Sequence, residues 1–121
     1  MKYRESEETY LETIYVLKQK KEDLHATDIA SELNFSKPSV SRALGLLEKR
    51  GYVTRNENGR IDFTQEGKQR AEDIYERHSV ITKLLIKLGA SESLAEENAC
   101  RIEHVICPEL FEIIKKFSEK E

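Results

Sequence analysis

The sequence predicts a mainly α-helical fold that is interrupted once, near its middle, by a two-stranded hairpin. Apolar residues recur at helical spacing on both sides of residues 52–63. Within that range, two short runs of strand-forming residues flank Asn58-Gly59, a dipeptide that strongly favours a tight turn between antiparallel strands. With 121 residues, the chain is long enough for a small module built around the hairpin and a short helical module after it.

The first predicted helix covers residues 6–20. Ser6 is a suitable N-cap, acidic residues follow it in the first turn, and apolar side chains recur between Tyr10 and Leu17. A polar connector then leads to a short second helix, for which Thr27 is the predicted N-cap. The side chains expected to face inward from this second helix are Ile29, Ala30 and Leu33.

Ser36 is predicted to cap a third helix, with Pro38 in its first turn, where the missing N–H costs nothing. Basic residues in the last turn and a glycine at Gly51 indicate where this helix ends. The two strands of the hairpin are predicted at residues 52–55 and 60–63.

Thr64 is predicted to cap a long helix over about residues 65–88, which Gly89 ends. Ser91 is predicted to start another helix that continues to the residue before Cys107. Because Pro108 disfavours helical geometry in the residue ahead of it, we expect a break at Cys107 and a short amphipathic helix after it.

We predict two domains, at residues 1–64 and 65–121, and the distribution of charge differs between them. From Lys37 to Arg60 there are six basic residues and two acidic ones, a balance of +4 that suits contact with phosphates. From Ser91 onward eight glutamates outnumber the basic residues. The net charge of the whole chain is only −3, so the charge is distributed unevenly along the sequence. That second region suits the binding of cations, or docking to something other than DNA.

The predicted order of a bracing helix, a second helix and a hairpin is typical of a winged helix-turn-helix, which binds DNA. In this fold the N-terminal side chains of the second helix face the major groove, and the hairpin is the wing. The alternative is that the serines are only helix caps and the basic residues only a solvated surface. The candidate DNA-binding residues are Ser36, Lys37, Pro38, Ser39, Ser41, Arg42, Arg55, Asn58 and Arg60.

Cys100, Glu103 and His104 are spaced i, i+3 and i+4, so they share one face of any helix that carries them. A thiolate, a carboxylate and an imidazole suit Fe(II), Mn(II), Co(II) or Zn(II) better than Ca(II). Three ligands do not complete a coordination shell, and His78 and Glu12 are candidates for the remaining positions. The alternative is that the cysteine is a small buried apolar residue and the histidine a hydrogen-bonded polar one.

Other polar residues carry less information. We expect His25 to lie at the surface without partners, and Cys107 to belong to the core or to be a bystander. The two cysteines are seven residues apart, which on one helix puts them about 10 Å apart along its axis, too far for a disulfide. The polar N-terminus resembles no signal peptide and no segment is apolar enough to span a membrane, so we expect a soluble, cytosolic protein.

The chain also resembles the iron- and manganese-dependent repressors typified by the diphtheria toxin repressor and the manganese transport regulator. The resemblance covers nearly the whole chain, in the short form of the family that has two domains. The motifs that carry it are Glu8-Thr9-Tyr10-Leu11-Glu12-Thr13-Ile14-Tyr15, Asp28-Ile29-Ala30, Pro38-Ser39-Val40-Ser41, Thr64-Gln65-Glu66-Gly67, Arg77-His78 and Ala99-Cys100-Arg101-Ile102-Glu103-His104-Val105.

The resemblance implies a homodimer that binds a palindromic DNA operator when it is loaded with a divalent metal, and that represses genes of metal uptake. It implies Fe(II) or Mn(II) in the cell, with Co(II), Ni(II) or Zn(II) possible in vitro. His78, Glu103 and His104 match ligands of both branches of the family. Cys100 matches the iron-type branch, whose manganese-type counterpart is glutamate, whereas Glu12 matches a bridging carboxylate of the manganese type.

Three positions depart from the family pattern. Thr9 stands where the iron type has methionine and the manganese type aspartate. At the ancillary metal site of the iron type, Thr82 replaces a glutamate and Glu96 replaces a histidine. The sequence therefore predicts a hybrid primary site and leaves the form of the ancillary site open.

Other functions remain as alternatives. A winged-helix regulator that senses a small molecule or an oxidant, with Cys100 or Cys107 as a redox switch, requires no metal. A small metallohydrolase with Glu103 as general base requires a substrate-binding module, for which the sequence shows no sign. A pure assembly module would not bind DNA. We predict a transcriptional repressor that is not an enzyme.

Overall fold

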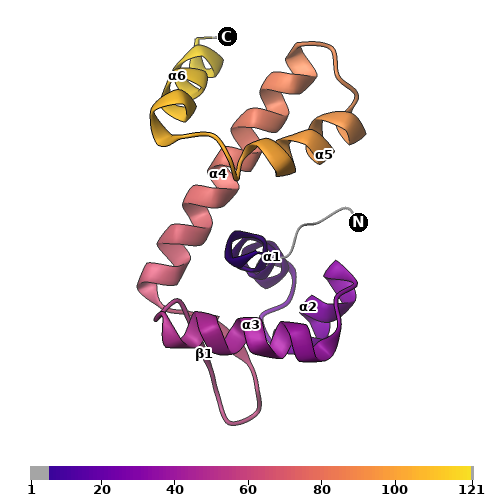
Figure 1. Cartoon of the computed structure of the whole chain (residues 1–121), viewed down its shortest axis with the longest axis vertical. Helices are drawn as coiled ribbons and strands as arrows, with labels where there is room; N and C mark the ends of the chain where they lie inside the picture. Colours follow the sequence, from indigo (N-terminus) through magenta and orange to yellow (C-terminus); the bar gives the residue numbers. More distant parts are fainter. Residues whose placement is uncertain (1–5, 121) are drawn as a thin grey trace. The chain divides into compact units, whose positions relative to one another are not determined.

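The computed structural model describes residues 6–120 of the chain and contains six helices and two strands in that range. The elements are α1 (Glu7–Lys20), α2 (Ala26–Leu33), α3 (Lys37–Lys49), β1 (Val53–Arg55), β2 (Ile61–Phe63), α4 (Gln65–Lys87), α5 (Glu92–Ile102) and α6 (Pro108–Glu119) (Figure 1). The predicted fold class, mainly helical with one two-stranded hairpin, is confirmed. The chain forms two compact units, of which the first extends to Glu72 and the second begins at Asp73.

In the first unit, α1 begins where the sequence predicts. The Ser6 hydroxyl accepts a hydrogen bond from the backbone N–H of Thr9 at 3.1 Å, so Ser6 is the N-cap. Tyr10 of α1 packs edge-to-face against Phe35, one of the three residues between α2 and α3, with ring centroids 6.0 Å apart. The apolar residues with no exposure to solvent in this unit are Leu11, Ile14, Leu24, Ile29, Val40, Leu44, Ile61 and Ala71.

The start of α2 differs from the prediction. The N-cap is His25 and not Thr27, which lies exposed in the first turn. The side chain of Asp28 accepts a hydrogen bond from the backbone N–H of His25 at 2.9 Å, and this bond supports the helix start. It is also the main reason that the pKa of Asp28 lies below its usual value. At the other end, Asn34 adopts a left-handed conformation (φ 58°), which ends α2 and turns the chain toward α3.

α3 and the hairpin follow the sequence closely. The Ser36 hydroxyl caps α3 by accepting from the backbone N–H of Ser39 at 3.2 Å, and Gly51 ends the helix with φ 82°. The strands are antiparallel, with Val53 opposite Phe63, and each is one residue shorter than predicted. Figure 1 shows the turn of the hairpin projecting beyond α3.

α4 begins directly against the hairpin. The Thr64 hydroxyl accepts from the backbone N–H of Gly67 at 3.0 Å and donates to the carbonyl oxygen of Gly51 at 2.6 Å. A Cβ atom at Gly67 would lie only 1.8 Å from the carbonyl oxygen of Tyr52. Glycine at this position is therefore what allows the first turn of α4 to approach the backbone ahead of β1.

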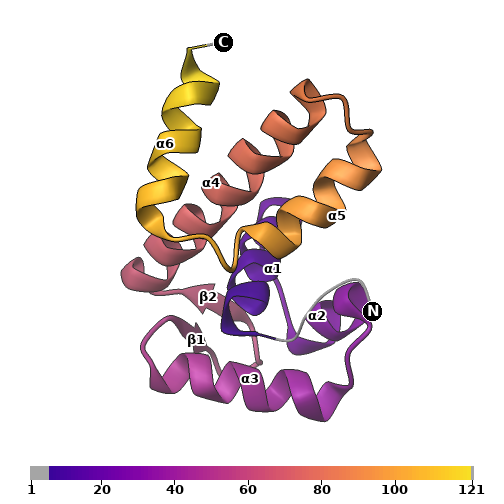
Figure 2. The same ribbon diagram turned by 45° about the horizontal axis from the view of Figure 1, so that its top comes forward.

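The second unit contains the rest of α4 with α5 and α6, which can be followed in Figure 2 from salmon to yellow. The Ser91 hydroxyl caps α5 as predicted, accepting from Leu94 N–H at 3.2 Å. α5 ends at Ile102, earlier than predicted, because the next residues form a tight turn in which Val105 N–H donates to the Ile102 carbonyl. The predicted break at Cys107 is confirmed, and no helix in the described part of the chain is long and apolar enough to cross a membrane.

Candidate metal centre and nucleic-acid interface

The turn that ends α5 holds a carboxylate with no exposure to solvent, that of Glu103. Its Oε1 atom lies 3.2 Å from Nδ1 of His78, on α4. Its Oε2 atom is also buried and has no hydrogen-bond partner among residues 6–120. Because an ionised carboxylate is costly to bury unless its oxygens are matched, the free oxygen marks a position that a cation would stabilise.

Two further donors surround this carboxylate. Cys100, Glu103 and His104 each offer one ligand atom, and these atoms all lie within 4.8 Å of one another. Cys100 is half-buried in the last turn of α5, and the side chain of His104 is only 13% exposed. The predicted shared helical face needs one correction, since Glu103 and His104 lie just beyond the helix. Glu103 nevertheless keeps helical backbone angles (φ −59°, ψ −24°), so the predicted spacing still brings the three side chains together.

These residues fit a divalent transition metal. A thiol, a carboxylate and imidazole groups are the donors that such ions prefer. Ions that bind only oxygen ligands, such as Ca(II), would not use the sulfur. His78 belongs to the same cluster through its contact with Glu103, and its side chain is 18% exposed. Four of the five residues that the sequence analysis selected for metal binding therefore lie together in the second unit.

The fifth candidate ligand, Glu12, lies half-buried on α1 in the first unit, and its role in metal binding stays a prediction. Thr9, which departs from the family pattern, is 3% exposed, and its hydroxyl accepts a hydrogen bond from Ser6 at 3.0 Å. At the ancillary positions, Thr82 Oγ1 is buried without a hydrogen-bond partner in the described part of the chain, and Glu96 is exposed on α5.

On α3, the candidate DNA-binding residues fall into two groups. Ser36 and Ser39 are occupied by the helix cap, and their hydroxyls also bond each other at 2.9 Å. The side chains that are exposed on the same end of the helix are Lys37, Pro38, Ser41 and Arg42. These exposed side chains are available to phosphates or base edges, whereas Ser36 and Ser39 have a structural role in the free protein.

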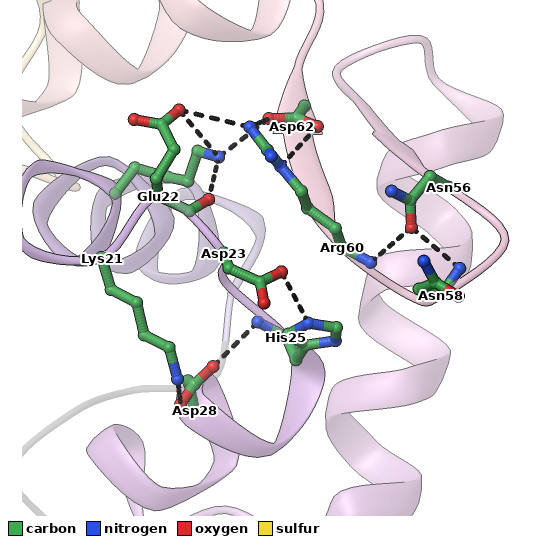
Figure 3. Close-up of polar contacts among 10 residues, drawn as sticks. Lys21, Glu22, Asp23, His25, Asp28, Asn56, Asn58, Arg60 and Asp62 are labelled. Carbon is green, nitrogen blue, oxygen red and sulfur yellow. Dashed lines mark hydrogen bonds and ion pairs between the residues drawn. The ribbon is translucent and has the colours of Figure 1, made fainter.

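On the wing, both candidate arginines are already ion-paired. Arg55 is half-buried and donates to Oε1 of Glu48 through Nε at 3.0 Å and through NH2 at 2.6 Å. Arg60 contacts Glu22 and Asp62 at the base of the wing (Figure 3). Asn58 is exposed at the turn, and its backbone N–H donates to the side chain of Asn56. The sequence analysis missed these acidic partners.

Two residues that we expected to be uninformative have defined positions. His25 has a partner after all, because its Nε2 atom lies 2.9 Å from Oδ1 of Asp23 (Figure 3). Its side chain is 32% exposed, so the prediction of an isolated surface residue is wrong. Cys107 is exposed at the start of α6 and does not belong to the core. Neither Cys100 nor Cys107 forms a disulfide within the described part of the chain.

Comparison with known protein families gives two matches. Residues 2–59 match the family described as iron dependent repressor, N-terminal DNA binding domain. Residues 64–120 match the family described as iron dependent repressor, metal binding and dimerisation domain. Together the two matches cover nearly the whole chain.

Curated relatives agree with these matches. The chain is 34% identical over 118 residues to an uncharacterised helix-turn-helix transcriptional regulator of Methanocaldococcus jannaschii, covering 96% of this chain and 94% of that protein. It is 28% identical to the transcriptional regulator MntR of Escherichia coli, covering 97% and 76% of the two chains. The diphtheria toxin repressor of Corynebacterium glutamicum is 31% identical over 104 residues, and the match covers 85% of this chain and 46% of that protein.

Solved structures show the same architecture. The manganese regulator SloR superposes with a TM-score of 0.85 at 25% identity, covering 98% of this chain and 55% of that one. A hypothetical protein from Sulfolobus solfataricus superposes with a TM-score of 0.72 at 24% identity, covering 95% and 88% of the two chains. The chain thus spans about half of the SloR chain, but most of the second one.

Proposed function

The chain belongs to the iron-dependent repressor family of metal-dependent transcriptional regulators, and on that premise we propose that it is a homodimer that binds a palindromic DNA operator when loaded with Fe(II) or Mn(II). Residues 1–64 serve as the DNA-binding domain and residues 65–121 as the metal-binding and dimerisation domain. The observation that carries the proposal is the buried Glu103 carboxylate, whose second oxygen has no hydrogen-bond partner in the described part of the chain.

Cys100, Glu103, His104 and His78 would hold the metal. Glu103 provides a carboxylate that has no exposure to solvent, and His78 is oriented by its contact with that carboxylate. We include Glu12 as a fifth ligand because it matches the bridging carboxylate of the manganese-type members of the family. When bound, the ion supplies positive charge that balances the negative charge of the buried Glu103 carboxylate.

The effect of metal on DNA binding then follows from linkage. The donors come from α4, from the end of α5 and, with Glu12, from α1. An ion that binds the DNA-competent arrangement of these helices more tightly than other arrangements raises the population of the competent one, and DNA in turn tightens metal binding. Cys100 and Glu12 have opposite preferences among divalent ions, since the Cys100 sulfur favours softer ions and the Glu12 oxygen favours harder ones.

α6 provides the surface for dimerisation. It carries three apolar side chains, Leu110, Ile113 and Phe117, that are between 45% and 64% exposed and share one helical face. The family described for residues 64–120 is named for dimerisation, which supports a second copy of this chain as the partner. Phe117→Glu should convert the dimer to a monomer in analytical ultracentrifugation, and an unchanged dimer would exclude this face.

DNA recognition is assigned to the exposed end of α3. Lys37 and Arg42 neutralise phosphates or bind guanine, and Ser41 allows close approach to the bases. Ser36, Pro38 and Ser39 define the start of the helix that presents them.

The decisive experiment titrates Mn(II), Fe(II), Co(II) and Zn(II) anaerobically while monitoring binding to a duplex that the protein has selected from a random library. The parent should bind the duplex more tightly with metal, and Cys100→Ser and His78→Ala should reduce that gain. Operator affinity that is unchanged by metal and by a chelator would exclude the proposed function.

A further inference from the structure

The base of the wing is attached to the connector between α1 and α2. The backbone N–H of Ile61, the first residue of β2, donates to the carbonyl oxygen of Leu24 at 2.8 Å. At the turn, a Cβ atom on Gly59 would lie 3.5 Å from Nδ1 of His25, so the connector also lies against the tip. Since strands of three residues form only a marginal hairpin by themselves, these attachments help to fix where the wing points.

Lys18 strengthens this attachment with charge. It lies near the end of α1, its side chain is only 13% exposed, and its Nζ donates to Asp62 Oδ1 on β2 at 2.8 Å. The same ammonium group donates to the backbone carbonyl of Glu22 at 2.8 Å. The bond from Lys18 is the main reason that the pKa of Asp62 lies below its usual value, which agrees with an ionised pair.

Arg60 completes a network of two cations and two anions. Its Nε lies 3.3 Å from Asp62 Oδ2, and its NH2 lies 3.3 Å from Glu22 Oε1 (Figure 3). Each charged group in the network therefore has an opposite charge within ion-pair distance. The side chain of Arg60 is 36% exposed, and its two acidic partners hold the guanidinium group before any phosphate approaches.

We propose that Lys18 is a positioning residue for DNA binding: through Asp62 it holds the wing in the orientation that the operator requires, and Arg60 acts first as a part of this wing anchor. The wing anchor consists of Lys18, Glu22, Arg60 and Asp62. The inference rests on the proposed function, because it assumes that the chain binds an operator. It adds a residue of α1 to the DNA-binding machinery, outside α3 and the wing.

The wing anchor and simple electrostatics predict opposite effects of one substitution. Asp62→Asn removes a negative charge close to the wing and releases Arg60 and Lys18. If the wing contributed only charge, this variant would bind DNA more tightly, with a steeper dependence on salt. If the wing must be oriented, the variant binds the operator more weakly.

The experiment measures Kd for the selected duplex and for an unrelated duplex, at fixed salt and saturating Mn(II). Asp62→Asn and Lys18→Met should each weaken operator binding by about tenfold, a typical effect for residues that act on a binding site without touching the ligand. Binding to the unrelated duplex should not weaken. Lys18→Arg should recover most of the operator affinity, because it restores the cation beside Asp62.

Glu57→Gln is the matched control, since Glu57 is exposed at the wing turn and the substitution removes the same charge from the same hairpin. It should leave operator binding unchanged or slightly tighter. Hydroxyl-radical footprinting supplies a readout that a general loss of stability would not change. Asp62→Asn should lose protection at only part of each half-site, whereas a loss of stability would reduce protection evenly across it. Circular dichroism and Tm check that each variant is folded, and Lys18→Met replaces Asp62→Asn if the latter is not.

The outcomes separate the inference from the proposed function. Operator binding by Asp62→Asn and Lys18→Met that equals or exceeds the parent's would overturn the positioning role and leave the repressor function intact. A parent that selects no duplex with any of the four metals would overturn both.

Discussion

Two charged clusters of four residues illustrate two uses of the same chemistry. In the wing anchor, Lys18 and Arg60 face Glu22 and Asp62, and the charges cancel within the protein. In the cluster at the end of α5, formed by Cys100, Glu103, His104 and His78, the Glu103 carboxylate is fully buried and keeps one oxygen without a hydrogen bond in the described part of the chain.

The difference lies in what completes each cluster. Partly exposed, mutually paired charges contribute little to the free energy of folding, but they fix one geometry. A buried carboxylate with an unmatched oxygen costs free energy until a cation reaches it. The wing anchor is therefore complete in the free protein, whereas the cluster at the end of α5 has one carboxylate oxygen that the proposed ion would match. Four substitutions test this contrast, from the largest expected effect to the smallest.

Glu103→Gln should have the largest effect, because it removes the buried charge that attracts the cation. We expect metal affinity, measured by isothermal titration calorimetry with Mn(II) and Zn(II), to fall by at least about 100-fold. Glu97→Gln on the same helix is the control, since Glu97 forms only a surface ion pair with Arg101 at 3.6 Å. Equal affinities for the parent and Glu103→Gln would show that the buried carboxylate is not a ligand.

Cys100→Ser should change which metals the proposed centre prefers, without abolishing metal binding. Without the soft sulfur, affinity for Zn(II) and Co(II) should fall by about tenfold or more, and affinity for Mn(II) by much less. The thiolate-to-cobalt charge-transfer absorption should disappear as well. Cys107→Ser, at an exposed thiol, provides the control. A cobalt absorption that survives in Cys100→Ser and vanishes in Cys107→Ser would show that Cys107, and not Cys100, is the sulfur ligand.

Acid should weaken the wing anchor before the helices melt. The pKa of Asp62 is lowered in the folded protein, mainly by the hydrogen bond from Lys18, so its contribution to stability is present above the unfolded pKa of about 4. That contribution is lost as the pH falls through the lower folded pKa. The free energy of unfolding should therefore decline less between pH 5 and pH 3 in Asp62→Asn than in the parent. Parallel curves for the two proteins would contradict the assignment.

The smallest effect is expected for an ion pair outside both clusters. Lys115 on α6 lies 3.0 Å from Glu76 on α4, and the bond to Glu76 raises the pKa of Lys115. Lys115→Gln should leave both Tm and metal affinity unchanged within error, because a solvated pair is weakened by water and salt. If Lys115→Gln lowered Tm as much as Asp62→Asn does, the Lys115–Glu76 pair would matter for stability as much as the Lys18–Asp62 pair, contrary to this expectation.

Much of the fold could be predicted because the signals act over a few residues. Ser6, Ser36, Thr64 and Ser91 each cap the helix that the sequence assigned to them. The exception is the start of α2, where Thr27 has the right chemistry but His25 is the cap, because the Asp28 side chain bonds the backbone one turn earlier. Several local candidates can thus compete, and the backbone path decides among them.

The metal cluster was only partly predictable for the same reason. Cys100, Glu103 and His104 are close in sequence, so helical spacing alone groups them. His78 stands 25 residues before Glu103. The sequence offered it as a candidate for an open coordination position, but no spacing rule places it beside Glu103. That the Glu103 carboxylate is buried, with one oxygen unmatched in the described part of the chain, is a property of packing that no spacing rule expresses.

The sequence by itself determined the helices, the hairpin and the grouping of Cys100, Glu103 and His104, because hydrophobic periodicity, caps, turns and helical spacing depend on neighbours within a few residues. Only the tertiary structure decided which charges pair. Lys18 and Asp62 are 44 residues apart, and no local rule distinguishes Arg60 as a phosphate contact from Arg60 as part of the wing anchor. That distinction arises from the path of the chain, which brings the connector after α1 against β2 and thereby sets the partner of each charge.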